Sequence, residues 1–338
     1  MYTLAATVIA VSVVLVGVWF LIEKRKRTTH AMPQGYQPNL TFAHEQEFEL
    51  YHNALSLCSM KTRLCMAELR IPYKSHHIDL IETGCYENIR PPLLTVNPGG
   101  TVPVLLHDGH PVYESHEQIR YAARFAPRHA PSLVPNDPRE RAAMEKWIDL
   151  SSLTSDPLNN GHKSAGNAVP GQTLPLFATM IEEIPYSRIA EGFLFHFDKI
   201  RPLLFTILKL TGIDNIHRIP PAAKVIAKTR SQLATHLDAF EERLAESGGP
   251  WILGETYSLA DVSWMVIFER LRQASAENVF WGDGKRPLTT AYWHRCQQRP
   301  AYTEAILGHS HPTIERGRKR IAQVKAANDS VRRCLEGS

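Results

Sequence analysis

The sequence predicts a small α/β domain followed by an all-helical domain, preceded by a single apolar helix at the N-terminus. Three observations carry this prediction: an apolar run over residues 2–22, a β-α-β pattern with a following β-hairpin and helix over residues 47–126, and helical periodicity over residues 139–310. A chain of 338 residues is long enough for two modest domains. Its 43% hydrophobic and 21% charged residues are ordinary for a globular protein.

Residues 1–23 are expected to form a transmembrane anchor. Residues 2–22 are almost entirely apolar, and about 20 such residues span the hydrocarbon core of a bilayer. A secretory signal places its positive charge before the apolar run and a small-residue cleavage site after it. Here the basic residues 24–27 follow the run instead. The positive-inside tendency then predicts a single-pass protein with its domains on the cytoplasmic side of the membrane.

The overall charge and the cysteines indicate which partners and which compartment to expect. A formal net charge of +4, with the basic residues gathered at the two ends, is weak support for a nucleic-acid partner, and none is expected. No metal site is expected either, because the sequence has no zinc-type cysteine pair. The five cysteines have no framework spacing, which suits a reducing compartment.

The α/β domain is expected over residues 47–126, after a polar tether over residues 24–46. The tether contains Pro33, Gly35 and Pro38, which interrupt regular structure. The expected elements of the domain are strands at 48–51, 73–80, 97–106 and 109–113 and helices at 59–69 and 114–125. A domain of this order and size forms one hydrophobic core.

The helical domain is expected over residues 139–310, after a linker over 127–138 that contains four prolines. Its clearest helices are expected at 139–153, 222–246 and 258–273, whereas the Gly- and Pro-punctuated stretch 159–175 is expected to be a loop. Residues 189–213 are very apolar but carry interior charges. A buried helix pair is the preferred interpretation, and a lid resting on the membrane is the alternative. Residues 311–338 form a basic tail.

Ser56 and Cys58 are the candidate catalytic residues. They follow a short strand and stand where a helix opens, so a thiolate there meets the positive end of a helix dipole. The Ser56 hydroxyl is suited to hydrogen-bond the sulfur of an incoming thiol, whose thiolate is the reactive form. The alternative is that Ser56 only caps the helix, although Ser59 is the better cap candidate. Cys58 is either a nucleophile or an inert buried thiol.

Two further pairs of residues offer binding groups. Val102-Pro103 precedes a strand, where a cis proline can turn the backbone outward to pair with a peptide. Glu114-Ser115 opens a helix whose hydroxyl and amides suit a carboxylate, while the Glu114 carboxylate suits an ammonium. In the helical domain, His162 and Lys163 either line a substrate cleft or belong to an exposed polar loop.

With these residues in place, the chain resembles a glutathione transferase over residues 48–308. The run Leu-Ser-Leu-Cys-Ser-Met-Lys-Thr-Arg-Leu over residues 55–64 is similar to the zeta-like members, the maleylacetoacetate isomerase and tetrachlorohydroquinone reductive dehalogenase types. The resemblance implies a thioredoxin-like N-terminal domain and an all-α C-terminal domain. It also implies that Ser56 activates glutathione, that Val102, Pro103, Glu114 and Ser115 bind it, and that Cys58 attacks a glutathionyl adduct.

The expected function is therefore a membrane-anchored glutathione transferase that uses glutathione as co-substrate and attacks a small hydrophobic electrophile. One alternative on the same fold is a glutathione-dependent reductase or reductive dehalogenase that depends on Cys58. A second alternative, from another class, is a non-catalytic binding module tethered to the membrane. The family suggests a homodimer. The N-terminal anchor and the apolar stretch 189–213 depart from the pattern of the soluble members.

Overall fold

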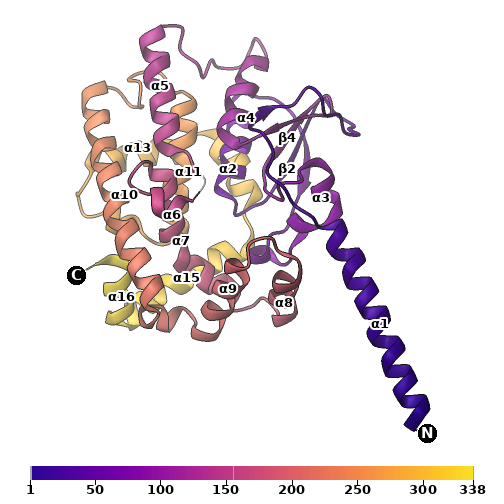
Figure 1. Ribbon diagram of the computed structural model, residues 1–338. Coiled ribbons are helices and arrows are strands. Elements are labelled where there is room, and N and C mark those ends of the chain that lie inside the picture. The colour runs from indigo at the N-terminus through magenta and orange to yellow at the C-terminus, as the bar shows by residue number, and fades with distance from the viewer. Residues whose placement is uncertain (1, 155, 338) are drawn as a thin grey trace.

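A computed structural model describes residues 2–154 and 156–337 of the protein. It contains an α/β domain, an all-helical domain and a long N-terminal helix that projects away from both (Figure 1). The mixed-sheet domain followed by a helical domain is the architecture that the sequence predicts, and this prediction is confirmed.

The α/β domain is built on a five-stranded sheet in the order β1-β5-β4-β2-β3. Its strands are β1 (Gly35–Tyr36), β2 (Phe48–His52), β3 (Lys74–His77), β4 (Val104–His107) and β5 (His110–Tyr113). The central strand β2 pairs in parallel with β3 and antiparallel with β4, while β4 and β5 form an antiparallel hairpin. Because successive side chains point to opposite faces, Phe48 and Leu50 face one core and Tyr51 the other.

Helices cover both faces of the sheet. The helices α2 (Leu57–Glu68) and α4 (Ser115–Ala122) pack together over one face, where Leu64 and Ile119 are fully buried. The short helix α3 (Pro91–Val96) covers the opposite face through Leu93 and Val96. This three-layer arrangement places the start of α2 and the start of α4 at neighbouring positions, next to the loop that enters β4.

The helical domain packs against α2 and continues the core of the first domain. Its helices are α5 (Pro138–Ser151), α6 (Pro157–Asn160), α7 (Ala165–Ile181), α8 (Tyr186–Phe195), α9 (Ile200–Thr211), α10 (Pro220–Ser247), α11 (Leu259–Gln273), α12 (Glu277–Phe280), α13 (Pro287–Gln297), α14 (Pro300–Ala305), α15 (Pro312–Ala327) and α16 (Asp329–Glu336). The almost entirely buried helix α11 lies at the centre and contacts α2, α5 and α7. Ser258 and Asp261 cap it reciprocally.

The stretch expected as a loop at 159–175 is largely helical, and that expectation is wrong. It contains α6 and most of α7, whose interior holds Pro170 and Pro175. The glycines here serve close packing rather than turns. A Cβ atom on Gly171 would lie 2.3 Å from the Oγ1 atom of Thr229 on α10, so a glycine at this position lets the two helices approach.

Both ends of the chain are more ordered than a tether and a tail suggest. Part of the predicted tether, residues 24–46, joins the sheet as the edge strand β1, which pairs with β5. In the basic tail, residues 311–338, the described part forms α15 and α16. Ile321 and Val331 are buried in a second hydrophobic core, which also contains Leu176 of α7 and Phe205 of α9. Apolar side chains at helical spacing therefore outweigh the high charge of this segment.

One described helix is long and apolar enough to cross a membrane. This helix, α1 (Tyr2–Lys26), contains a candidate span over Leu4–Lys26 with a mean hydropathy of 2.6 and none of its window buried in the protein. Lys24, Arg25 and Lys26 close its last turn, which is the favourable end of the helix dipole for positive charge.

Candidate active site

Ser56 is the N-cap of α2 and lies at the surface where the two domains meet. Its Oγ atom accepts a hydrogen bond from the backbone N–H of Ser59 over 3.2 Å and donates to the carbonyl oxygen of Val102 over 3.4 Å. The expectation that Ser59 caps the helix is wrong, because the buried hydroxyl of Ser59 instead accepts the N–H of Asn53. Ser56, Leu57 and Cys58 remain partly exposed, so the turn is accessible to a ligand.

Buried polar side chains hold this turn in place. The carboxamide oxygen of Asn53 accepts the N–H groups of Leu55 and Ser56 over 2.8 and 3.2 Å. The guanidinium group of Arg63 donates to the carbonyl of Asn53, and that of Arg270 donates to the carbonyl of Leu55. Burial lowers the pKa of both arginines to about 10. Because one arginine comes from α2 and the other from α11, both domains fix the turn.

The loop before β4 faces the Ser56 turn. The Val102–Pro103 peptide bond is cis, as expected for this position, and it brings the Val102 carbonyl to Ser56. Within the described residues, no group accepts the N–H of Val102, so this edge has a free backbone donor. Gln118 fastens the loop, because its side-chain amide donates to the carbonyls of Pro103 and Val112 while its oxygen accepts the hydroxyl of Thr62.

Glu114 and Ser115 open α4 beside the same loop. Glu114 has a positive φ of 68° and makes no side-chain cap, so the first N–H groups of α4 have no side-chain acceptor from this position. Desolvation raises the pKa of the Glu114 carboxyl, while the nearby Lys61 ammonium opposes this rise. Glu114 is exposed, whereas Ser115 is 3% exposed. A helix start with a cation near it is suited to binding a carboxylate.

The sequence analysis missed two buried cations that interact electrostatically with Cys58. Lys61 follows Cys58 by one turn of α2, is 2% exposed and has no hydrogen-bonding or ion-pairing partner among the described residues. Burial lowers its pKa, and the Cys58 thiol and Glu114 carboxyl act in the opposite direction. Arg270 also interacts electrostatically with Cys58. The i, i+3 spacing of Cys58 and Lys61 was the available signal; no spacing links Cys58 to Arg270 on α11.

Comparison with protein families identifies the two domains. The N-terminal domain model of glutathione S-transferases matches residues 55–124, which contain the Ser56 turn and the start of α4. The C-terminal domain model of the same enzymes matches residues 223–289 in the helical domain.

The chain belongs to the glutathione S-transferase superfamily.

Relatives of this chain include reductive dehalogenases. The tetrachloro-p-hydroquinone reductive dehalogenase of Sphingobium chlorophenolicum is 27% identical over 77% of this chain and 95% of its own length. The 2,5-dichlorohydroquinone reductive dechlorinase of Sphingobium indicum is 26% identical over 86% and 92%. The β-etherase LigF of Sphingobium sp. strain SYK-6 shares the fold, with a TM-score of 0.62, 20% identity and coverage of 78% of this chain and 100% of that one.

The predicted cleft residues His162 and Lys163 do not join the Ser56 turn. His162 and Lys163 are exposed in the turn between α6 and α7. That turn rests on α10, where His236 bonds the carbonyl oxygen of Gly161 over 2.8 Å. No contact within the described residues joins His162 or Lys163 to Ser56 or Cys58. The structure thus groups Ser56, Cys58, Val102, Pro103, Glu114 and Ser115, and leaves these two outside the group.

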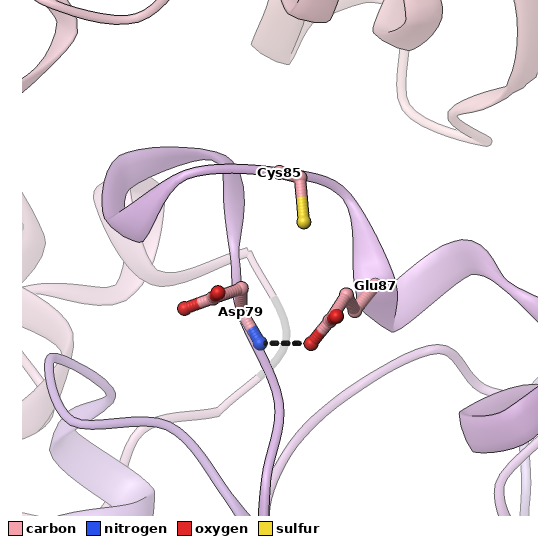
Figure 2. A group of neighbouring side chains, drawn as sticks. All are labelled: Asp79, Cys85 and Glu87. Carbon is pink, nitrogen blue, oxygen red and sulfur yellow. Dashed lines mark hydrogen bonds between the residues drawn. The ribbon is translucent and has the colours of Figure 1, made fainter.

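Asp79, Cys85 and Glu87 form a separate cluster whose ligand atoms lie within 4.8 Å of one another (Figure 2). The Glu87 carboxylate accepts the backbone N–H of Asp79 over 2.7 Å, and the Asp79 carboxylate bonds His77 over 3.1 Å. Burial raises the pKa of the Cys85 thiol, with Glu87 acting in the same direction. Because both carboxylates already have protein partners, we interpret this cluster as a brace for its loop.

Proposed function

We propose that the chain is a membrane-anchored glutathione transferase in which Ser56 activates the glutathione thiol for attack on a small hydrophobic electrophile. The observation that carries the proposal is the convergence of Ser56, the free N–H of Val102 and the start of α4 on one side of the domain. These groups offer a hydroxyl for a sulfur, a backbone edge for a peptide and a carboxylate site, which are the three needs of a γ-glutamyl tripeptide.

In this proposal, Ser56 exchanges one hydrogen bond for another when glutathione binds. Its hydroxyl donates to the Val102 carbonyl over 3.4 Å, which is long for an O–H···O bond, so the proton is readily redirected. A thiolate placed at the turn accepts this proton in a charge-assisted bond, which stabilises the ionised and nucleophilic form of the thiol. The Val102 backbone pairs with the tripeptide, while Glu114 and Ser115 hold its γ-glutamyl end.

The test is a comparison of Ser56→Ala with Ser59→Ala in the full chain purified in detergent. Ser56→Ala is expected to reduce kcat/KM for glutathione conjugation by about 10- to 150-fold, because a hydrogen bond to a charged group contributes about 1.5–3 kcal/mol. Ser59→Ala removes a neighbouring buried hydroxyl that does not face the site. Equal activity in the Ser56→Ala and unmodified proteins would remove Ser56 from this role.

A second candidate function, supported by the two cations beside Cys58, is glutathione-dependent reductive dehalogenation. The dehalogenase relatives favour it as well. In this reaction, the Cys58 thiolate attacks the sulfur of a glutathionyl adduct. A Cys58–glutathione disulfide forms, and the released carbanion takes a proton. A second glutathione then reduces the disulfide and leaves as oxidised glutathione.

Cys58→Ser separates the two candidates. If the chain is a reductase, the variant stalls with the glutathionyl adduct, which accumulates in proportion to substrate consumed. If it is a simple transferase, conjugation continues at a similar rate. Absence of glutathione-dependent turnover across a panel of electrophiles, in protein whose folding has been verified, would instead favour a non-catalytic binding module.

The anchor and a homodimer are further parts of the proposal. The apolar α1 places the domains at a bilayer on its cytoplasmic side, where glutathione is present in reduced form and apolar electrophiles concentrate. Mass measurement of the chain in lipid nanodiscs tests the homodimer, and accessibility of the domains to protease in sealed vesicles tests the orientation.

A further inference from the structure

The α8–α9 pair exposes a continuous apolar face. Its inner side is buried in the second core through Ile189, Phe205 and Leu208. Its outer side carries exposed apolar residues from both helices and their connection: Phe193, Leu194, Phe197, Ile200, Leu203 and Leu210. Ile200 and Leu210 are 75% and 70% exposed. Single exposed apolar residues are common on proteins, but a gathered set of this kind marks an interaction surface.

The helix α8, which carries part of this face, contacts the last turns of α1. The rings of Trp19 and Phe20 on α1 lie 6.1 and 5.7 Å from the ring of Phe195 on α8. The guanidinium group of Arg27 stacks over Phe195 at 4.4 Å and forms an ion pair with Glu191 of α8 at 2.9 Å. Figure 1 shows α8 beside the end of α1 that adjoins the domains. A bilayer crossed by α1 therefore comes close to the α8–α9 pair.

Positive charges border the same region. Lys24, Arg25 and Lys26 end α1, and Lys199 lies between α8 and α9 with its ammonium on the carbonyl of Phe193. Desolvation lowers the pKa of the Lys199 ammonium, and the charge of Lys24 acts in the same direction. An apolar face edged by lysine and arginine is the pattern of helices that lie in the membrane interface, because the cations meet anionic headgroups.

We propose that the outer face of α8–α9 docks into the lipid leaflet that α1 enters, with acyl chains against its apolar side chains and anionic headgroups against its lysines. This proposal depends on membrane insertion of α1 and not on glutathione chemistry. Docking fixes the orientation of the catalytic domains as well, because Arg201 of α9 forms an ion pair with Glu82 of the α/β domain. A single spanning helix would otherwise leave the domains free to tilt.

The test uses the full chain in vesicles of phosphatidylcholine and phosphatidylglycerol that contain a phospholipid with a photoreactive diazirine on its acyl chain. After illumination, labelled peptides are mapped by mass spectrometry. We expect labels in peptides from α1 and from residues 193–210. The double variant Leu203→Glu, Leu210→Glu should lower labelling of the 193–210 peptides on the order of tenfold. The reason is that carboxylates on this face would have to enter the acyl-chain region of the leaflet, which is unfavourable. Labelling of α1 should stay unchanged.

The matched control is the double variant Leu288→Glu, Leu307→Glu, which places the same charges at exposed leucines outside the proposed face. It should leave labelling of the 193–210 peptides intact. Both double variants should melt within a few degrees of the unmodified protein, because all four leucines are exposed.

Three outcomes would overturn the proposal. The 193–210 peptides label no more than the peptides around Leu288, or α1 itself fails to label, or the face carries crosslinks to a second copy of the chain in place of lipid. Glutathione turnover does not enter any of these readouts, so failure of the docking proposal is distinguishable from failure of the proposed enzymatic function.

Discussion

Lys61 lies one turn after Cys58 on the same helix, and its charge interacts with both the Cys58 thiol and the Glu114 carboxyl, although its ammonium forms no hydrogen bond or ion pair with a described residue. A buried cation without a hydrogen-bonding partner is costly to keep, since burial disfavours its charged form. We therefore expect its ammonium to gain a partner when an anionic ligand binds.

Lys61→Met tests this expectation, because methionine fills similar volume without the charge. Affinity for glutathione should weaken on the order of tenfold, because a hydrogen bond to a charged group contributes about 1.5–3 kcal/mol. The melting temperature should not fall. Isothermal titration calorimetry measures the affinity. The control is Lys224→Met on the exposed side of α10, which should leave the affinity unchanged. Unchanged affinity in Lys61→Met would contradict the expectation.

The buried His52 should make the folded protein less stable in acid. Its Nδ1 atom accepts from Arg63 over 3.1 Å, so Nε2 carries the proton and donates to Ser75 over 2.7 Å. Burial, reinforced by the Arg63 charge, lowers the pKa of His52 to about 2. Since an unfolded histidine takes up a proton near pH 6.5, the unfolded state binds more protons than the folded state between about pH 6.5 and 2.

Stability should therefore fall as pH decreases below about 6.5, by up to about 1.4 kcal/mol per pH unit from this group. His52→Gln should flatten that slope in urea unfolding curves recorded from pH 7 to 5. His196 and His309, whose pKa values burial lowers to about 4, act in the same direction and keep part of the slope. The exposed His129→Gln variant should retain the full slope, and an equally steep slope in His52→Gln would contradict the assignment.

Gly171→Ala should destabilise the helical domain. The added Cβ atom would lie 2.3 Å from the Oγ1 atom and 2.6 Å from the Cγ2 atom of Thr229, so α7 and α10 must move apart. Overpacking of this kind costs about 1–3 kcal/mol. Denaturant unfolding measures the loss. In Gly308→Ala the new atom meets only ordinary contact at 3.5 Å, so its unfolding free energy should change little. A similar small change in Gly171→Ala would show that the helices adjust without cost.

Much of the fold is readable from local pattern, because strand alternation and helix caps act over a few residues. The order of β2, α2, β4, β5 and α4 alone brings Ser56 to Val102 and Glu114, since these residues end neighbouring elements of one sheet. The role of Arg270 could not be predicted from local pattern, because it donates to the Leu55 carbonyl from 215 positions away in the sequence. The helix α7 could not be predicted in this way either. Its glycines and prolines are typical of loops, and only the neighbouring helix shows that small residues are needed there for close packing.

The choice between Ser56 and Ser59 as the cap of α2 could not be made from the sequence. Two serines three positions apart both suit a helix start, and only the exit direction of β2 decides which one has the extended backbone of a cap. The strand β1 has two residues, too few for any alternation to appear. Residues 189–213 form the expected helix pair, but only one side of each helix is buried, and the lid on the membrane stays a prediction.

Glu191 gathers three arginines: Arg27 from the end of α1, Arg90 before α3 and Arg188 on its own helix, at 2.9 to 3.1 Å. These ion pairs lower the pKa of its carboxyl against the effect of burial. The ion pairs of Glu191 therefore fix the orientation of α1 relative to the α/β domain and α8. Ionic strength and substitutions at Glu191 should change the direction in which the Ser56 turn faces relative to α1, without changing the residues of the turn itself.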